Sequence, residues 1–330
     1  MILISWKPFR LNTWMPVSRK FIEQSERKEK MNSIQMALAG ISGVHVTPFG
    51  DDGEIHEAQL RKVVDGIASA GIHNIVTGGN TGEFYAQDLA EICRVYELAV
   101  EANAGRALIT AGVGRSAREA IKLAVAAKDA GVDALMIHQP PDPFCSPRLV
   151  VDYIKQIADA TDLPIIAYAR SPGLMPEHFV RMGEIENVVA IKYAVPDPLR
   201  LAECIRATRG QALQWICGLA ESWALPFYAC GARGFTSGLV NVNPELSLRI
   251  YAALEENDLA KARLLIDAIA DFEQMRTLES NGANVTVVKE AMNQIGIAVG
   301  AVRAPGVIAL NPGQRERLAV LLDDWRKLSV

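Results

Sequence analysis

The sequence lacks any long hydrophobic run. Its apolar stretches are only about 5 to 8 residues long, against the roughly 20 that a membrane-spanning helix needs. It also has few cysteines: five in 330 residues, scattered and without Cys-x-x-Cys or His–Cys spacing. A disulfide framework and a zinc site are therefore not expected, and a reducing cytoplasm is the natural compartment. We predict a soluble protein with no membrane partner.

Excess positive charge is missing as well. The net charge of −4 argues against a general nucleic-acid partner. No cluster of His, Asp and Glu has the spacing of metal ligands, so no metal is expected. What the chain does have is apolar material: 50% of its residues are hydrophobic and 22% are charged, enough for a sizeable core. This composition is typical of a soluble metabolic protein.

Residues 1–37 differ from the rest of the chain. They contain Trp6, Trp14, seven basic residues and three acidic ones. The apolar start is too short for a signal peptide, and three glutamates are unusual in a transit peptide. We interpret residues 1–37 as an extension outside the fold that packs on a neighbouring subunit.

From Gly40 onward, short apolar runs alternate with longer amphipathic stretches. Eight of the short runs have the character of buried strands. Such a series of strand–helix units implies parallel strands with right-handed crossovers, and eight strands close a barrel. We predict an α/β fold, a TIM (β/α)8 barrel over residues 38–257. Its strands are expected at Ile41 to Thr47, Asn74 to Gly78, Ala107 to Gly112, Ala134 to His138, Pro164 to Tyr168, Val188 to Tyr193, Leu213 to Cys217 and Gly234 to Ser237.

The stretches between the strands carry helix signals. Ser116 and Glu119 make a capping box, and Gly131 stands where that helix should stop. Asn243 followed by Pro244 is typical of a cap and first turn. Further helical stretches predict a C-terminal helical region over residues 258–330, with helices around Leu259 to Leu278, Val285 to Ile297 and Gln314 to Leu328.

A single lysine, Lys192, lies near the end of the apolar run Val188 to Ala194. In a buried strand its ammonium would be poorly solvated, which lowers the pKa of a lysine and frees a nucleophilic amine. The alternative is a lysine that reaches water past the strand end. The neighbouring run Pro164 to Tyr168 ends in a phenol, which would place a proton relay beside the amine.

Other candidate site residues follow from their places at predicted strand ends, where the active sites of such barrels lie. The turn Gly78 to Phe84 is rich in glycine and suits an anion, although a plain structural loop is the more common explanation of such a turn. It has neither a GxGxxG motif nor a P-loop lysine, which disfavours nucleotide binding. Arg170 is a candidate for gripping a second carboxylate, or forms an ordinary ion pair. The remaining candidates for substrate contacts are His138, which a core role also explains, Gly218, Thr236 and Ser237.

Gly79 to Glu83, Tyr168 and Val189 to Lys192 together resemble the signature of the dihydrodipicolinate synthase and N-acetylneuraminate lyase family. The resemblance extends over residues 38–328 and includes Arg303 to Pro305. It implies that Lys192 forms a Schiff base with the ketone of pyruvate or another 2-keto acid and that Tyr168 relays protons. Thr81, with the amides of Asn80 and Thr81, would bind the carboxylate of that acid.

The resemblance also implies a homotetramer and no cofactor beyond the covalent lysine imine. The sequence departs from the synthase pattern in three places. Asn80 stands where the synthases have the first threonine of their loop, the tyrosine exchanged between subunits has no counterpart in Gln139 to Pro143, and Gly173 stands where an arginine grips aspartate semialdehyde. These departures leave imine formation intact but weaken the case for lysine biosynthesis.

We therefore expect a Schiff-base lyase that acts on pyruvate or a 2-keto-3-deoxy sugar acid by aldol cleavage, condensation or dehydration. One alternative is a dihydrodipicolinate synthase that condenses pyruvate with aspartate semialdehyde. Another is a barrel that binds a keto acid without catalysis, since a fold does not fix a function.

Overall fold

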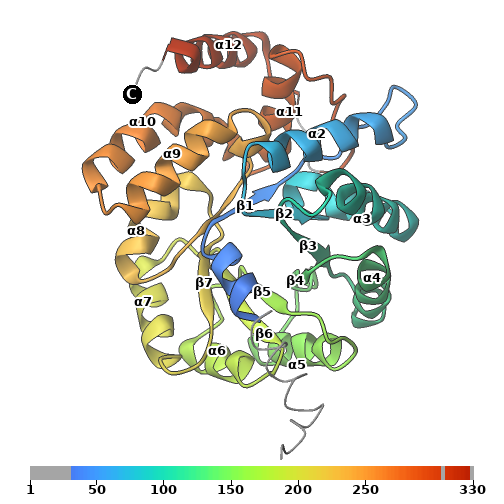
Figure 1. Ribbon diagram of the computed structural model, residues 1–330, viewed down its shortest axis with the longest axis vertical. Coiled ribbons are helices and arrows are strands. Elements are labelled where there is room, and N and C mark those ends of the chain that lie inside the picture. The colour runs from blue at the N-terminus through green and yellow to red at the C-terminus, as the bar shows by residue number, and fades with distance from the viewer. Residues whose placement is uncertain (1–30, 306–308, 328–330) are drawn as a thin grey trace, which may run out of the picture.

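The computed structural model describes residues 31–305 and 309–327 of the chain. Its centre is a closed barrel of eight parallel strands, in which each strand pairs with the next and the last pairs with the first (Figure 1). The predicted fold class is confirmed. The strands are β1 (Ile41–Val44), β2 (Asn74–Thr77), β3 (Leu108–Val113), β4 (Ala134–Ile137), β5 (Ile165–Ala169), β6 (Val188–Tyr193), β7 (Gln214–Cys217) and β8 (Phe235–Ser237).

All eight predicted strand positions are confirmed, although β1 ends three residues before the predicted Thr47. Beyond Val44 the chain forms hydrogen bonds with the 3₁₀ turns at the barrel rim instead of with a neighbouring strand. The Val46 N–H donates to Asn241 Oδ1 at 3.0 Å, and the Thr47 hydroxyl donates to the Gly82 carbonyl at 2.7 Å. The residues before and after the end of β1 are similarly apolar, so composition does not show where the strand stops.

Helices surround the barrel, and short 3₁₀ turns lie at the strand ends. The helices are α2 (Glu57–Ser69), α3 (Leu89–Asn103), α4 (Ala117–Ala130), α5 (Pro147–Ala158), α6 (Pro176–Gly183), α7 (Pro198–Ala207), α8 (Glu221–Cys230), α9 (Pro244–Glu255), α10 (Leu259–Arg276), α11 (Asn284–Gln294) and α12 (Pro312–Lys327). The 3₁₀ turns are η1 (Asn80–Gly82), η2 (Phe84–Ala86) and η3 (Leu239–Asn241). None of the described helices is long and apolar enough to cross a membrane.

The predicted helix caps are confirmed. The Ser116 side chain accepts from the Glu119 N–H, and the Glu119 carboxylate accepts from the Ser116 N–H in return. Gly131 ends α4 with φ of 90°, a left-handed conformation that glycine adopts without strain. Asn243 caps α9 by accepting from the Leu246 N–H at 3.1 Å.

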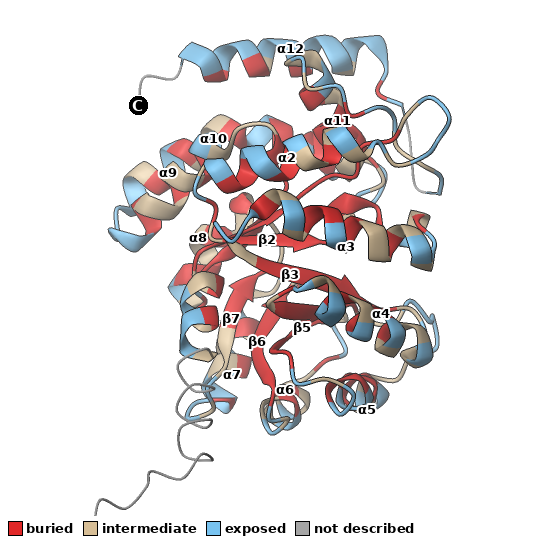
Figure 2. Cartoon of the chain, turned by 45° about the vertical axis from the view of Figure 1, so that its right-hand side comes forward, coloured by how far each residue is buried: buried red, intermediate tan, exposed pale blue. Residues whose placement is uncertain are grey.

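The molecule has two apolar layers, one between the strands and the surrounding helices and one inside the barrel. The strands are buried along almost their whole length, and the helices expose only their outer faces (Figure 2). Polar groups inside the barrel are paired: Asn74 donates to Ser42 at 3.0 Å and accepts from Thr110 at 2.8 Å. A well-packed interior makes the barrel a rigid support for residues at its rim.

Residues 31–38 form a helical segment that packs against the interior of the barrel (Figure 1). Ile34 and Leu38 are 2% and 1% exposed, and they contact the apolar side chains inside the barrel. The Gln35 side chain donates to the Ala212 carbonyl at 2.6 Å and to the Val189 carbonyl at 3.2 Å. The predicted extension, residues 1–37, therefore reaches too far: the fold includes Met31 onward, because this segment covers apolar surface. Residues 1–30 lie outside the described part of the chain.

The C-terminal helices form the predicted region beyond the barrel. Helix α10 packs against α8, α9, α11 and α12, and α11 contacts the 3₁₀ turns η1 and η3 at the rim. The last residues of the predicted region, 328–330, lie outside the described residues. Through the contact of α11 with η1, the C-terminal helical region reaches the glycine-rich turn after β2.

The segment that closes the barrel is open to a direct test. We expect Leu38→Ala to lower the free energy of unfolding by about 2 to 5 kcal/mol, because it removes buried apolar contacts and leaves a cavity. Met36, in the same segment, is 71% exposed, so Met36→Ala should change it by less than about 0.5 kcal/mol. Urea unfolding of the full chain measures both. Equal effects of the two substitutions would contradict the packing described here.

Candidate functional site

A cavity of about 590 Å³ opens at the ends of the barrel strands. Eight of the residues predicted from the sequence line it, and they come from five strands or the turns directly after them. These residues are Asn80, Thr81, Tyr168, Arg170, Lys192, Gly218, Thr236 and Ser237. The structure therefore brings together positions spread over more than 150 residues of sequence, as expected for the carboxyl ends of barrel strands.

Lys192 is buried at the base of the cavity. It is 6% exposed, and its Nζ lies 3.7 Å from the Met136 sulfur and 4.0 Å from the centre of the Tyr168 ring. Burial first, and then the positive charge of Arg170, lower its pKa to about 7, against a smaller opposing effect of Cys217. A substantial fraction of the amine is therefore neutral at neutral pH.

Tyr168 lies beside Lys192 because β5 and β6 are neighbours and these two residues are paired in register. Burial raises the pKa of the Tyr168 hydroxyl, while Arg170 and a hydrogen bond with the Asn80 side chain lower it to a smaller extent. The phenol therefore keeps its proton at neutral pH. Asn80 lines the cavity, and its Oδ1 atom is buried without a hydrogen-bond partner.

The glycine-rich turn after β2 is a compact 3₁₀ turn. The Gly82 N–H bonds to the Gly79 carbonyl, and the Gly82 carbonyl accepts from the Thr47 hydroxyl at 2.7 Å and the Gln87 amide at 2.6 Å. Gly79 itself does not line the cavity; a Cβ there would lie 2.4 Å from a Val44 methyl group, so close packing explains the glycine. These bonds hold Asn80 and Thr81 against the cavity.

His138, like Gly79, does not line this cavity; it borders a smaller one that shares Arg170. It is 1% exposed, stacks on Phe84 and bonds through Nε2 to the Gly78 carbonyl at 2.9 Å. Burial lowers its pKa to about 3, so it is neutral. The structure favours a core role for His138. Arg170 differs from it: the guanidinium stands at the cavity without an ion pair or hydrogen bond to another described residue.

One wall of the cavity was missed by the sequence interpretation. It comes from the end of α10 and the turn into α11, and its polar residues are Glu273, Arg276, Thr277, Asn281 and Asn284. These positions follow the barrel in sequence and carry no motif, so only the packing of the C-terminal helices places them over the strand ends. An i, i+3 pair of opposite charge, Glu273 and Arg276, was the one signal present in the sequence.

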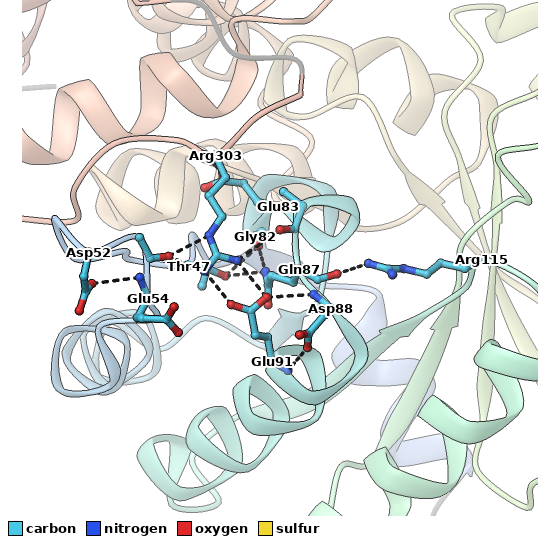
Figure 3. A network of polar contacts seen from close by, with 12 residues as sticks. Thr47, Asp52, Glu54, Gly82, Glu83, Gln87, Asp88, Glu91, Arg115 and Arg303 are labelled. Carbon is cyan, nitrogen blue, oxygen red and sulfur yellow. Dashed lines mark hydrogen bonds and ion pairs between the residues drawn. The ribbon is translucent and has the colours of Figure 1, made fainter.

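The glycine-rich turn is fastened to the C-terminal region through Glu83. This residue has φ of 61°, and its carboxylate pairs with Lys289 Nζ of α11 at 2.6 Å. Its other oxygen accepts from the Arg303 N–H at 2.7 Å. Figure 3 shows the Arg303 side chain reaching down to the Glu91 carboxylate, which it binds with two hydrogen bonds, 2.9 and 2.6 Å long. Arg303 therefore holds the back of the turn.

The Glu83–Lys289 pair is almost fully buried, with side chains 5% and 2% exposed. Burial raises the pKa of Glu83 and lowers that of Lys289, while the ion pair itself opposes both shifts. Lys289 is also held by the Ala301 carbonyl at 2.9 Å and lies over the Phe49 ring. Each charge therefore depends on its partner, because water does not reach either of them.

Comparison with known proteins agrees with the fold. The model of the family described as "Dihydrodipicolinate synthetase family" matches residues 37–324. The chain is 30% identical over 295 residues to the 4-hydroxy-tetrahydrodipicolinate synthase of Methanothrix thermoacetophila, covering 88% of this chain and 97% of the relative. It is also 30% identical over 293 residues to the probable 5-dehydro-4-deoxyglucarate dehydratase of Methylobacterium radiotolerans, covering 87% and 95%.

A solved structure is similar as well. The crystal structure of dihydrodipicolinate synthase from Oceanobacillus iheyensis superimposes with a TM-score of 0.87 and 38% identity, and the match covers 90% of this chain and 99% of that one. The relatives thus include both synthases and dehydratases, so their names leave the substrate open.

The buried ion pair behind the turn gives a testable expectation. Lys289→Met should lower the free energy of unfolding by about 3 to 5 kcal/mol, because it leaves the Glu83 charge buried without a partner. Lys155 pairs with Asp159 on the surface, where both side chains are at least 60% exposed, so Lys155→Met should cost less than about 1 kcal/mol. Urea unfolding compares the two. A loss for Lys289→Met no larger than for the surface control would argue against the stabilising role of the buried pair.

Proposed function

The chain belongs to the dihydrodipicolinate synthetase family, and from that premise we propose that it is a lyase that joins Lys192 to a 2-keto-3-deoxy sugar acid as a Schiff base. The observation that carries this proposal is the pairing of Lys192 with Tyr168 at the base of the cavity. A neutral amine beside a protonated phenol supplies both the nucleophile and the proton donor of imine chemistry. A pure binding site needs neither group, which disfavours the barrel that binds without catalysis.

The first steps follow from these two groups. The Lys192 amine attacks the ketone carbon, and the carbinolamine loses its hydroxyl as water after taking a proton that Tyr168 relays. The protonated imine then accepts electrons from the substrate: either a C3 proton leaves, or the C3–C4 bond breaks, and an enamine forms in both cases. Loss of the C3 proton followed by departure of the C4 hydroxyl, which takes up a proton and leaves as water, is a dehydration. In C3–C4 cleavage the C4 hydroxyl gives its proton to the Tyr168 relay, and an aldehyde is released.

The glycine-rich turn supports the binding of the substrate carboxylate. Thr81 lines the cavity and the turn is fixed from behind by Glu83, so its polar groups are held in place before the ligand arrives. We assign the carboxylate next to the ketone to Thr81 and to the Asn80 and Thr81 amides. Gly218 leaves room for Lys192: a Cβ at this position would lie 3.1 Å from the lysine Cγ and 2.9 Å from the Tyr193 carbonyl.

The choice of a sugar acid over aspartate semialdehyde rests on the distal part of the site. Gly173, which stands where the resemblance expects an arginine for aspartate semialdehyde, does not line the cavity. Asn80 replaces one relay hydroxyl and adds an unpartnered acceptor. Among the relatives, a probable 5-dehydro-4-deoxyglucarate dehydratase acts on a keto-deoxy sugar acid by its name. The synthase reaction remains the second candidate, because other relatives of similar identity carry that name.

The same family membership leads us to propose a cytoplasmic homotetramer that uses no cofactor besides the lysine imine. Within the described residues, no three His, Cys, Asp or Glu side chains are grouped as metal ligands. The reaction as written needs none, because the imine itself is the electron acceptor.

Turnover assays separate the two candidate functions. We expect kcat/KM for a 2-keto-3-deoxy sugar acid such as 2-keto-3-deoxygluconate to exceed that for aspartate semialdehyde with pyruvate by at least about tenfold, since Gly173 provides no guanidinium at the position where the resemblance expects one for aspartate semialdehyde. Lys192→Arg should reduce both activities to background, because a guanidinium stays protonated. Faster turnover of aspartate semialdehyde would reverse the assignment. Activity that survives Lys192→Arg would exclude the Schiff base.

A further inference from the structure

The C-terminal helices add a wall of polar side chains to the cavity. Glu273 and Arg276 lie in the last turn of α10, opposite the strand ends that carry Lys192 and Ser237, and all four residues line the same cavity. At about 590 Å³ this cavity has room for much more than a three-carbon keto acid. The far wall therefore faces whatever part of a longer substrate extends away from the imine.

The side chains of this wall are held in fixed positions. Arg276 Nη1 pairs with Glu273 Oε1 at 2.6 Å, and the two side chains are only 5% and 10% exposed. Arg276 Nη2 donates to Asn284 Oδ1 at 3.1 Å. Gly238, directly after β8, makes room for the guanidinium, since a Cβ there would lie 2.6 Å from Nη2. Arg276 is thus built into the wall rather than lying loosely over it.

One donor of Arg276 is left over. Its Nε atom is buried and has no hydrogen-bond partner. A buried N–H of a guanidinium without an acceptor is costly, and native structures rarely leave one unless a water or ligand supplies the acceptor. This unpartnered donor, in a residue that lines the cavity, favours a bound acceptor at this wall.

The charge of the wall indicates which group of a substrate tail it would bind, a hydroxyl group or a second carboxylate. The Glu273 carboxylate neutralises Arg276, and Glu221 lies close behind, fully buried and bonded to Ser247 at 2.6 Å. The pKa of Glu221 is raised to about 7, by burial first and then by the charge of Glu273. A second anion here would meet carboxylates already present. A hydroxyl group, which both donates and accepts, matches a wall that offers a carboxylate, a guanidinium and two amides.

We propose that Glu273 and Arg276, with Asn281 and Asn284 beside them, form a subsite for the hydroxyl groups of the substrate tail and thereby select polyhydroxylated 2-keto acids over pyruvate alone. This inference rests on the proposed function, because it assumes that the substrate is held at Lys192. It names specificity residues and not catalytic ones: the wall binds the tail, and the imine chemistry stays with Lys192 and Tyr168.

The experiment compares a tailed and a tailless keto acid on the same covalent readout. The full chain is incubated with pyruvate or with 2-keto-3-deoxygluconate, the imine is reduced with cyanoborohydride, and the concentration that gives half-maximal adduct is measured by intact mass. Glu273→Gln and Arg276→Gln should raise this concentration for 2-keto-3-deoxygluconate by about 10- to 100-fold, the value of a hydrogen bond to a charged group. For pyruvate it should change by less than about twofold, within the scatter of a surface substitution.

Two further variants keep the test sharp. Asp271→Asn, on the same helix but in an exposed pair with Arg317, is the control and should leave both values unchanged. Asn281→Ala alters an exposed residue of the wall, so it should fold even if the buried substitutions do not, and it should raise the value for 2-keto-3-deoxygluconate alone by about 2- to 10-fold.

Each outcome has a distinct meaning. Selective weakening of the tailed acid supports the subsite. Equal weakening of both acids in folded variants indicates a structural role and overturns it, as does no change in any folded variant while the wild-type chain still turns over 2-keto-3-deoxygluconate. Failure of the wild-type chain to form an adduct with either acid overturns the proposed function and the subsite with it.

Discussion

The desolvation of one amine is the constraint on which the rest of the site depends. Lys192 stands in a strand that is buried on both sides, and among the described residues no carboxylate pairs with it; its amine lies beside a thioether and an aromatic ring. This environment lowers the pKa of the lysine to about 7, which a surface lysine does not reach. Burying the protonated amine also lowers the free energy of unfolding, so other interactions in the barrel must compensate for this loss of stability. The paired interior polar groups and the buried segment 31–38 contribute to this compensation.

The second constraint is that a flexible glycine-rich turn must present its polar groups in one arrangement. Its fixation comes from residues more than 200 positions away: Lys289 neutralises Glu83, and Arg303 joins the turn to α3 through Glu91 (Figure 3). The C-terminal region therefore contributes in two places: it holds the glycine-rich turn from behind, and it lines the cavity through Glu273 and Arg276. It belongs to the candidate site and is not merely attached to the barrel.

The barrel, its eight strands and the helix caps could be predicted from the sequence because they depend on local patterns. Buried strands, capping boxes and a lysine after an apolar run are each legible within a few residues. The same holds for Lys192, Tyr168 and Thr81, whose place at strand ends follows once the barrel is assumed. His138 was also at a strand end, but its ring turned into the core to stack on Phe84, a choice that sequence position does not decide. Residues 31–37 and the wall of α10 were missed because their roles arise from tertiary packing alone.

We propose that burial makes Lys192 an imine-forming amine at neutral pH. The most direct measurement is the initial rate of adduct formation with pyruvate and cyanoborohydride, followed from pH 5 to 11 by mass spectrometry of the Lys192 peptide and corrected for the reagent's own pH dependence. We expect an adduct on Lys192 whose rate of formation rises with pH and is half-maximal near pH 7, because only the neutral amine attacks and the pKa is lowered to about 7. No adduct on Lys192 in the folded protein, or a midpoint near the 10.4 of a solvated lysine, would contradict it.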